Sequence, residues 1–365
     1  MTISTRKSVL SDRHRALGSN LGDWNGMGVA WEYASDPCAE HDAVRTSAGL
    51  FDVSGLRKVW VRGRDALAVL DQVVTRNLKV IDAGKSAYGP NLTEEGTICD
   101  DSIMFNLGND EWLLVHGSGQ CMERTEESGA GRNVDIEFDD DLHDLSLQGP
   151  AAVDLLNAHT PMDLPSLGYF HQQKTELFGH PVILSRTGYS GERGYEIFAA
   201  AEHTVDLWDQ ILGAGAALGI MPCSFTCLDK IRVEAALLFY PYDMTQATSP
   251  WEVGLDWALS RNTDYRGREA VMALRGQEKI KVAGICADHG EALAGGELLL
   301  RDGQQVGVVN SPVYSHRLGK SIALVHLRPD AAAVGTQLRV EGDISCAAVV
   351  EKTPFHDPEK TRTHA

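Results

Sequence analysis

The segment from Ser185 to Ile197 carries the residue types that a pocket for a flat, polar ligand needs. It reads Ser-Arg-Thr-Gly-Tyr-Ser-Gly-Glu-Arg-Gly-Tyr-Glu-Ile. Its glycines recur at every third position, where they allow sharp turns and close approach of a ligand to the backbone. Tyr189, Tyr195 and Glu196 add aromatic faces and a carboxylate acceptor. A glycine-rich hairpin turn is the alternative interpretation. A dinucleotide loop does not fit, because the glycines do not follow G-x-G-x-x-G and a strand-like run comes next.

The same segment closely resembles the signature of the aminomethyltransferase family, which comprises the glycine-cleavage T-protein and its tetrahydrofolate-dependent relatives. Other blocks are similar to the family pattern and follow its order along nearly the whole chain. They are Glu40-His41-Asp42-Ala43-Val44-Arg45, Ala48-Gly49-Leu50-Phe51-Asp52-Val53-Ser54, Ala87-Tyr88, Glu95-Gly96-Thr97-Ile98-Cys99-Asp100-Asp101, Leu147-Gln148-Gly149-Pro150, Arg232-Val233-Glu234-Ala235, Tyr265-Arg266-Gly267-Arg268-Glu269-Ala270 and Thr353-Pro354-Phe355. One short match would carry little weight, but together they identify the chain as a member of the family.

Hydrophobic periodicity predicts the elements that must position these residues. Strands and helices follow one another up to about residue 276, and short strands with glycine-rich turns follow beyond it. The clearest predicted strands are 58–62, 102–107 and 112–116, and the clearest helices are the segment after Asp65, 202–218 and 224–238. The pattern therefore indicates an α+β region followed by a β-rich one.

The resemblance implies an α+β fold in which two α+β units and a C-terminal β-barrel-like domain are arranged as a cloverleaf around a folate site. We expect a folate-binding catalytic region of two interleaved α+β units at 1–276, the barrel-like domain at 277–357 and a tail at 358–365. Length agrees with several packed units, because 365 residues exceed the size at which one hydrophobic core keeps growing.

Tetrahydrofolate is the cofactor that the resemblance implies, and the matched motifs suggest roles for single residues. Asp101 matches an aspartate near the reactive edge of the folate, where a carboxylate can orient the N5 and N10 region or accept a proton. By spacing alone, an Asx turn before a strand is the alternative. Glu196 matches a glutamate that accepts hydrogen bonds from the pterin. The further cofactor contacts expected from the resemblance are Tyr88, Tyr169, Tyr189 and Arg232, and a structural salt bridge is an equal alternative for the arginine.

Several residues depart from the family pattern and bear on the methyl donor. His116 stands where the family often has asparagine, and it is our candidate proton donor for the leaving group. His171 is the reserve. Trp24, Trp31 and Tyr33 could contact the substrate as an aromatic cage or belong to the core.

A site of this kind suits transfer of a methyl group from a small molecule to N5 of tetrahydrofolate. We expect demethylation of an aromatic methyl ether such as a methoxybenzoate, because aromatic and histidine residues are added around an otherwise preserved folate site. The alternatives are a glycine-cleavage aminomethyltransferase (T-protein), which would need a lipoyl carrier protein, a sulfonium or N-methyl demethylase, and a non-catalytic folate-binding protein. The last belongs to a branch with a Lys-Gly-Cys-x-x-Gly-Gln motif, which the sequence lacks.

Composition argues against several classes of partner. Acidic residues outnumber basic ones, 51 to 33, and the resulting charge of −18 disfavours nucleic acids and anionic membranes. No stretch approaches the roughly 20 apolar residues that span a bilayer.

The seven cysteines include no C-x-x-C pair, which is typical of reduced thiols in a cytoplasmic protein. Cys223 and Cys227 could share a helix face, but no metal site is predicted because further ligands are missing.

Overall fold

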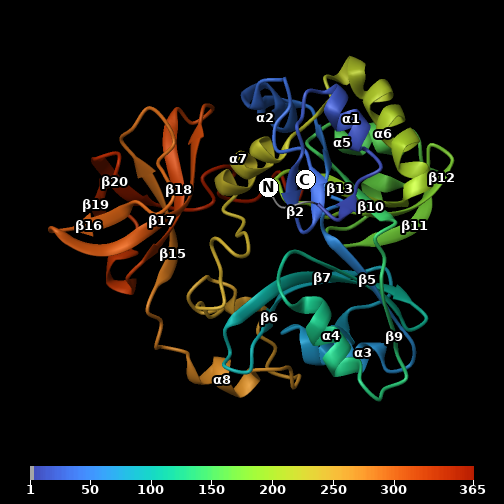
Figure 1. Cartoon of the computed structure of the whole chain (residues 1–365), viewed down its shortest axis with the longest axis horizontal. Helices are drawn as coiled ribbons and strands as arrows, with labels where there is room; N and C mark the ends of the chain where they lie inside the picture. The colour runs from blue at the N-terminus through green and yellow to red at the C-terminus, as the bar shows by residue number, and fades with distance from the viewer. Residues whose placement is uncertain (1–3) are drawn as a thin grey trace.

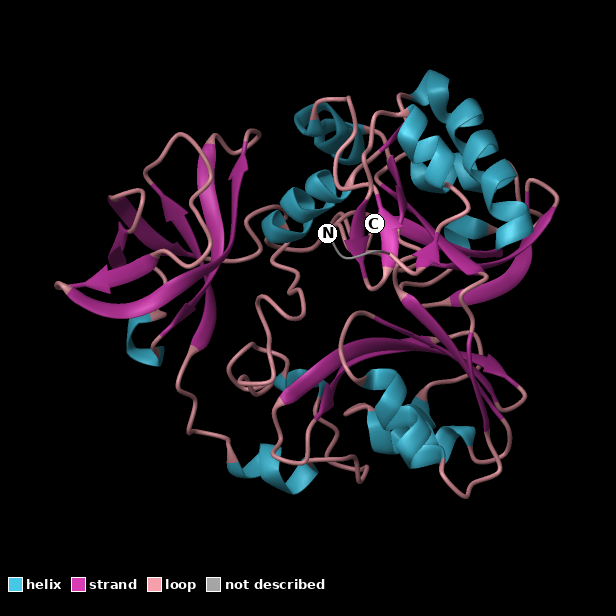
Figure 2. Ribbon diagram, viewed as in Figure 1, coloured by secondary structure: helices cyan, strands magenta, loops and turns pink. Residues whose placement is uncertain are grey.

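The computed structural model describes residues 4–365, which form three lobes around a common centre (Figure 1). Two lobes are α+β, each with helices on the outer face of a sheet, and the third is a β-barrel made by the C-terminal part of the chain (Figure 2). This arrangement confirms the predicted α+β fold with a C-terminal barrel.

The first α+β lobe is a five-stranded sheet with the order β6-β7-β8-β5-β9. Its strands are β5 (Arg57–Arg62), β6 (Ser86–Leu92), β7 (Ile98–Gly108), β8 (Glu111–His116) and β9 (Asp135–Phe138). Helices α3 (Ala66–Val73) and α4 (Cys121–Gly129) cover one face. Met104 and Leu114 point to the helices and pack against Leu70. Because strand residues alternate between faces, the other face is available to a second sheet.

The second α+β lobe is a six-stranded sheet with the order β11-β12-β13-β10-β4-β14. Its strands are β4 (Gly49–Asp52), β10 (Leu142–Gln148), β11 (Gln172–Leu177), β12 (His180–Ser185), β13 (Gly194–Ala200) and β14 (Met221–Pro222). Helices α5 (Ala152–Asn157) and α6 (Ala201–Gly215) cover its outer face. The chain enters this sheet at β4, builds the whole first lobe, and returns at β10, so the two units are interleaved.

The inner faces of the two sheets pack against each other. Trp60, Phe105 and Val115 of the first lobe meet Ile183 and Phe198 of the second. The rings of Phe105 and Phe198 lie edge to face with centroids 5.4 Å apart. We call this contact the apolar seam. Polar residues of the same strands that point inward therefore lie next to it.

The third lobe is a closed barrel with the order β15-β18-β17-β16-β19-β20. Its strands are β15 (Lys281–Ala287), β16 (Leu298–Arg301), β17 (Gln304–Ser315), β18 (Lys320–Leu327), β19 (Gln337–Glu341) and β20 (Cys346–Glu351). Closure satisfies the edge strands that an open sheet would expose. Val313 and Ile322 point outward and pack on Val233 of α7 (Phe225–Glu234). This helix therefore links the barrel to the second lobe.

The remaining elements are short. They are β1 (Arg6–Lys7), β2 (Gly22–Trp24), β3 (Met27–Val29), α1 (Ser11–Ala16), α2 (Pro37–Thr46) and α8 (Arg268–Ala273). The two helices predicted at 202–218 and 224–238 correspond to α6 and α7, and α7 is shorter than predicted. It ends at Glu234 because Ala236 adopts a φ of 53°, a left-handed conformation that an α-helix does not continue through. Among residues 4–365, no helix has the length and apolar character needed to cross a membrane.

Candidate active site

Asp101 points from β7 toward the apolar seam. It lies on the same face of the strand as Ile103 and Phe105, which both pack in the seam. Asp100 lies instead on the face of Met104, which α3 and α4 cover. Alternation along one strand thus brings Asp101 to the inner side of the sheet and Asp100 to the helical side.

Tyr88 of the neighbouring strand β6 shares the inner face with Asp101, because it pairs with Ile103. Its hydroxyl donates a hydrogen bond to Asp101 Oδ2 at 2.9 Å. Burial, and in second place the charge of Asp100, raise the pKa of Asp101 to about 7. A carboxyl group that titrates near neutral pH can both donate and accept a proton.

Two further tyrosines surround this carboxyl group. Burial raises the pKa of Tyr189, and Asp101 is among the acidic groups close enough to raise it further. The Tyr189 hydroxyl donates to the carbonyl oxygen of Leu238 at 2.5 Å, which fixes the ring to the segment after α7. Tyr240 belongs to the same segment, and its pKa is raised by burial and then by nearby acidic groups that include Asp101. Tyrosines from three parts of the chain, Tyr88, Tyr189 and Tyr240, therefore lie within electrostatic reach of Asp101.

Glu196 of β13 occupies the inner face of the opposite sheet, where it pairs with Ser146. Thr187 donates a hydrogen bond from its hydroxyl to Glu196, and burial raises the pKa of the Glu196 carboxyl. Asp144 lies on the same face of β10. Within the part of the chain that is described, both of its carboxylate oxygens are buried without a hydrogen-bond partner. Burial and then the charge of Glu196 raise the pKa of Asp144.

Tyr169 lies near the Glu196 end of the site. The residue is 39% exposed, and its ring makes edge-on contacts with Phe170 and His364, both at 4.8 Å. Burial of the phenol and then the charge of Glu196 raise the pKa of Tyr169. The tyrosine therefore lies within electrostatic reach of the carboxylate.

The structure does not bring His116 together with Asp101. His116 ends β8 opposite Ser102 and so lies on the helical face of the sheet. Its Nδ1 is 2.8 Å from Asp100 Oδ2, and both side chains are fully buried. We therefore withdraw His116 as the proton donor, because the strand separates it from the inner face. The backbone of His171 forms an isolated antiparallel β-bridge with that of Lys85, which connects the two lobes. The role of His171 as the reserve donor stays a prediction.

Arg232 is fully engaged by protein groups. Its Nε donates to Asp229 at 2.8 Å, its Nη2 donates to Ser311 at 2.8 Å, and its Nη1 bonds Asp243. Ser311 belongs to β17, so the guanidinium ties α7 to the barrel. Each nitrogen of the side chain therefore makes a protein contact, which is the structural salt bridge that the sequence left open, and the cofactor contact stays a prediction.

Trp24 and Trp31 belong to a row of aromatic rings, whereas Tyr33 does not. Neighbouring ring centroids are between 5.1 and 6.4 Å apart in the order Trp31, Phe225, Trp24, Phe239, Tyr242, which we call the aromatic row. Its two ends, Trp31 and Tyr242, are exposed. Tyr33 is buried and its hydroxyl bonds His14 Nδ1 at 2.9 Å, so this tyrosine is a core residue.

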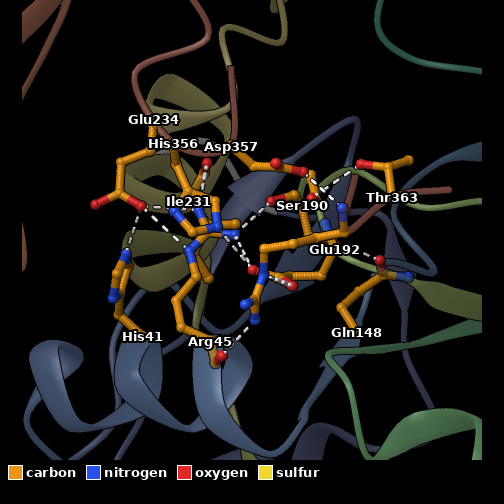
Figure 3. Close-up of polar contacts among 12 residues, drawn as sticks. His41, Arg45, Gln148, Ser190, Glu192, Ile231, Glu234, His356, Asp357 and Thr363 are labelled. Carbon is orange, nitrogen blue, oxygen red and sulfur yellow. Dashed lines mark hydrogen bonds and ion pairs between the residues drawn. The ribbon is translucent and has the colours of Figure 1, made fainter. Parts of the chain in front are cut away.

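A buried charged cluster supports the segment that carries Tyr189 and Glu196 (Figure 3). Arg45 of α2 donates to the Ser190 carbonyl oxygen at 2.8 Å, to Glu192 at 3.0 Å and to Glu234 at 2.8 Å. Arg45 and Glu234 belong to separate motifs of the sequence. No local pattern could pair them, because they lie 189 residues apart.

Two interleaved α+β lobes, a tyrosine-lined and acidic inner face and a closed C-terminal barrel define a T-protein-like class of fold. Residues 10–263 match the family model described as GCVT N-terminal domain, and residues 281–357 match that of the glycine cleavage T-protein C-terminal barrel domain. The chain therefore belongs to the aminomethyltransferase, or glycine-cleavage T-protein, family, as the motifs predicted.

Named relatives extend over nearly the full chain. A protein of Ectopseudomonas mendocina named heme-dependent oxidative N-demethylase gamma subunit is 47% identical and covers 100% of both chains. An aminomethyltransferase of Streptomyces coelicolor is 32% identical and covers 91% of this chain and 92% of its own. The crystal structure of glycine cleavage system aminomethyltransferase T from Bartonella henselae has a TM-score of 0.90 at 23% identity, covering 97% and 99% of the two chains. This last likeness confirms the fold.

Proposed function

We propose that this protein is a tetrahydrofolate-dependent one-carbon transferase that works with an oxidative N-demethylase and takes up the carbon removed from an N-methyl amine. The observation that carries the proposal is Asp101, a carboxyl group with a pKa of about 7 that faces the seam beside Tyr88. The donor class and the partnership with other subunits rest on the relative that covers the whole chain at 47% identity. N-methyl demethylation was one of the alternatives that the sequence left open.

The inner face has the donor and acceptor character that a reduced pterin needs. The pterin edge presents amino and ring N–H groups, which require acceptors. Thr187 occupies one oxygen of Glu196, and in residues 4–365 both oxygens of Asp144 lack a partner. Tyr88 and Tyr189 add aromatic surface. In this proposal the pterin is held by Glu196, Asp144 and the tyrosines. Asp101 lies beside N5 and N10 of the pterin and exchanges protons there.

Proton transfer is the chemical task of the chain in this reaction. Oxidation of an N-methyl group and cleavage of its C–N bond leave the amine and carbon at the oxidation level of formaldehyde. Tetrahydrofolate supplies two nucleophilic nitrogens that take up this carbon, with loss of one water and no further oxidation or reduction. Asp101 in its acid form gives a proton to the departing oxygen, and its carboxylate then accepts the proton that the second nitrogen releases. A pKa of about 7 makes both forms accessible at neutral pH.

An aromatic methyl ether is the second candidate donor, and the aromatic row from Trp31 to Tyr242 is the observation that favours it. Flat rings of this kind offer stacking surface to an aromatic substrate. The two donors differ in their product, because an ether methyl group on N5 gives 5-methyltetrahydrofolate, whereas carbon at the formaldehyde level gives 5,10-methylenetetrahydrofolate. The T-protein reaction would require an aminomethyl-lipoyl carrier protein and would release ammonia.

The folate product tests the proposal. Purified protein and tetrahydrofolate are mixed in separate reactions with limiting formaldehyde, with a methoxybenzoate and with an aminomethyl-lipoyl carrier protein, and the folates are separated and quantified. We expect methylenetetrahydrofolate from formaldehyde at a rate above the uncatalysed condensation, and no methyltetrahydrofolate from the methoxybenzoate. A rate equal to the uncatalysed one would contradict the proposal, and 5-methyltetrahydrofolate from the methoxybenzoate would favour the ether.

A further inference from the structure

We propose that His41, Asp42 and His316 form a site for a divalent metal ion at the contact between α2 and the barrel, and that zinc is the ion their nitrogen and oxygen ligands favour. His41 and Asp42 belong to α2, and His316 follows β17 directly. One ligand atom from each of the three residues lies within 4.8 Å of the other two. This site shares no residue with the site around Asp101 and does not rest on the proposed function.

His41 has the environment of a metal-binding histidine. Its side chain is fully buried, and its Nε2 lies 2.8 Å from Glu234 Oε2 (Figure 3). Metal-bound histidines commonly donate their second ring N–H to a carboxylate in this way, which fixes the tautomer. A proton on Nε2 leaves a lone pair on Nδ1, and in the described residues this atom is buried without a partner.

Asp42 and His316 supply the other two ligands. His316 Nε2 lies 3.1 Å from Asp42 Oδ1, and His41 Nδ1 lies 4.0 Å from the same oxygen. Tetrahedral zinc with bonds of about 2.0–2.1 Å holds neighbouring ligand atoms about 3.3 Å apart. Small side-chain rotations would therefore close the site. The side chains of Asp42 and His316 are 47% and 24% exposed, so water can reach the fourth position.

Arg317 is the group that opposes a cation here. Its Nη1 donates to Asp42 Oδ1 at 2.8 Å and so occupies the oxygen that the metal needs. The side chain is 40% exposed and can turn into solvent. Metal binding must displace this ion pair, which predicts that Arg317→Gln binds zinc more tightly than the wild type.

A second cluster of metal-ligand residues, Glu40 with Cys223 and Cys227, is less suited to a cation. Glu40 Oε1 accepts a hydrogen bond from Ser35 at 2.5 Å, and Oε2 accepts bonds from the backbone N–H and the hydroxyl of Ser224 at 2.8 and 2.7 Å. Burial raises the pKa of the Cys223 thiol well above its ordinary value, so the thiolate that zinc requires is disfavoured. The Glu40 carboxylate therefore already has its hydrogen-bond donors and the Cys223 thiol is protonated, so this cluster is a poorer site for a cation.

Zinc titration of the chelator-treated full chain tests the proposal. Isothermal calorimetry is carried out on the wild type, Asp42→Asn, His316→Ala, Arg317→Gln and His180→Ala. The last is a matched control, because His180 bonds Asp206 at 2.6 Å and its ring centroid lies 4.9 Å from that of His203, so it is a histidine with a similar aspartate and histidine beside it. We expect one zinc per chain in the wild type and control, at least about tenfold weaker binding without Asp42 or His316, and tighter binding in Arg317→Gln.

Cobalt substitution identifies the ligands independently. We expect an absorption spectrum without a thiolate-to-cobalt charge-transfer band, and a rise in unfolding temperature with zinc that His316→Ala lacks. No zinc binding by the wild type, unchanged binding in both Asp42→Asn and His316→Ala, or a thiolate band that assigns the metal to the cysteines would each overturn the proposal.

Discussion

Asp100 and Asp101 are adjacent in β7, yet their carboxyl groups lie on opposite faces of the sheet. The backbone N–H of Asp101 donates to Asp100 Oδ1 at 2.9 Å, and Asp100 Oδ2 is bound to His116 at 2.8 Å. The carboxyl group of Asp101 is bound instead to Tyr88. Burial and, in second place, the charge of Asp100 on the helical face raise the pKa of Asp101 on the inner face to about 7.

Replacement of Tyr88 by phenylalanine is expected to raise the pKa of Asp101 above 7, because in the wild type the Tyr88 hydroxyl stabilises the Asp101 carboxylate. A hydrogen bond to a charged group contributes about 1.5–3 kcal/mol, which corresponds to roughly one to two pKa units. The pH dependence of turnover checks this, with Tyr33→Phe as the control, because that hydroxyl bonds His14. An unchanged midpoint in Tyr88→Phe would show that this hydrogen bond does not set the titration.

The buried carboxyl group is also expected to make stability depend on pH. Asp101 has a pKa of about 7 in the folded chain and an ordinary value of 3.8. Between these two values the folded state binds more protons than the unfolded state, so the free energy of unfolding falls as pH rises. Asp101→Asn removes this contribution. Urea unfolding over this pH window measures the difference between wild type and variant, and parallel curves would contradict the assignment.

Glu196→Gln is expected to weaken tetrahydrofolate binding by roughly 10- to 100-fold, because a carboxylate that accepts pterin N–H bonds contributes about 1.5–3 kcal/mol. Isothermal calorimetry measures the dissociation constant. Glu176→Gln on β11 is the matched control, since that glutamate is exposed. Equal affinity in the two variants would remove Glu196 from the folate site.

Arg232→Met is expected to lower stability by about 3–5 kcal/mol, because Asp243 then remains buried without its partner. Folate affinity of the folded variant should stay close to that of the wild type. Urea unfolding measures the first quantity and calorimetry the second. If Arg232→Met unfolds like the wild type but binds tetrahydrofolate more weakly, Arg232 contacts the cofactor, as one of the two sequence interpretations holds.

The motifs predicted the family, the fold and three residues that the structure places on the two inner faces, Asp101, Tyr88 and Glu196. His116 was misplaced for a physical reason. The strands at 102–107 and 112–116 were correctly predicted, but the face that a strand residue occupies depends on register, and one residue of slip reverses it. An irregularity between Asn106 and Gly108 sets this register, and it has no clear sequence signal.

Long-range contacts account for the other differences. Arg232 meets Ser311 across 79 residues, so its salt-bridge role could be stated from the sequence only as an alternative. Tyr33 bonds His14, which local patterning does not pair with it. Trp24 and Trp31 do share an aromatic row, but its other rings come from distant segments. Side chains that depend on tertiary contacts were therefore less predictable than those within motifs.

The role of Asp101 in proton transfer is tested most directly by comparing Asp101→Asn with the wild type in tetrahydrofolate binding and in single-turnover formation of methylenetetrahydrofolate. We expect the variant to bind tetrahydrofolate within a few-fold of the wild type and to react about 10²- to 10⁴-fold more slowly, which is the usual contribution of a positioned acid or base. A variant that binds tetrahydrofolate and keeps the full wild-type rate would contradict the assignment of proton transfer to Asp101.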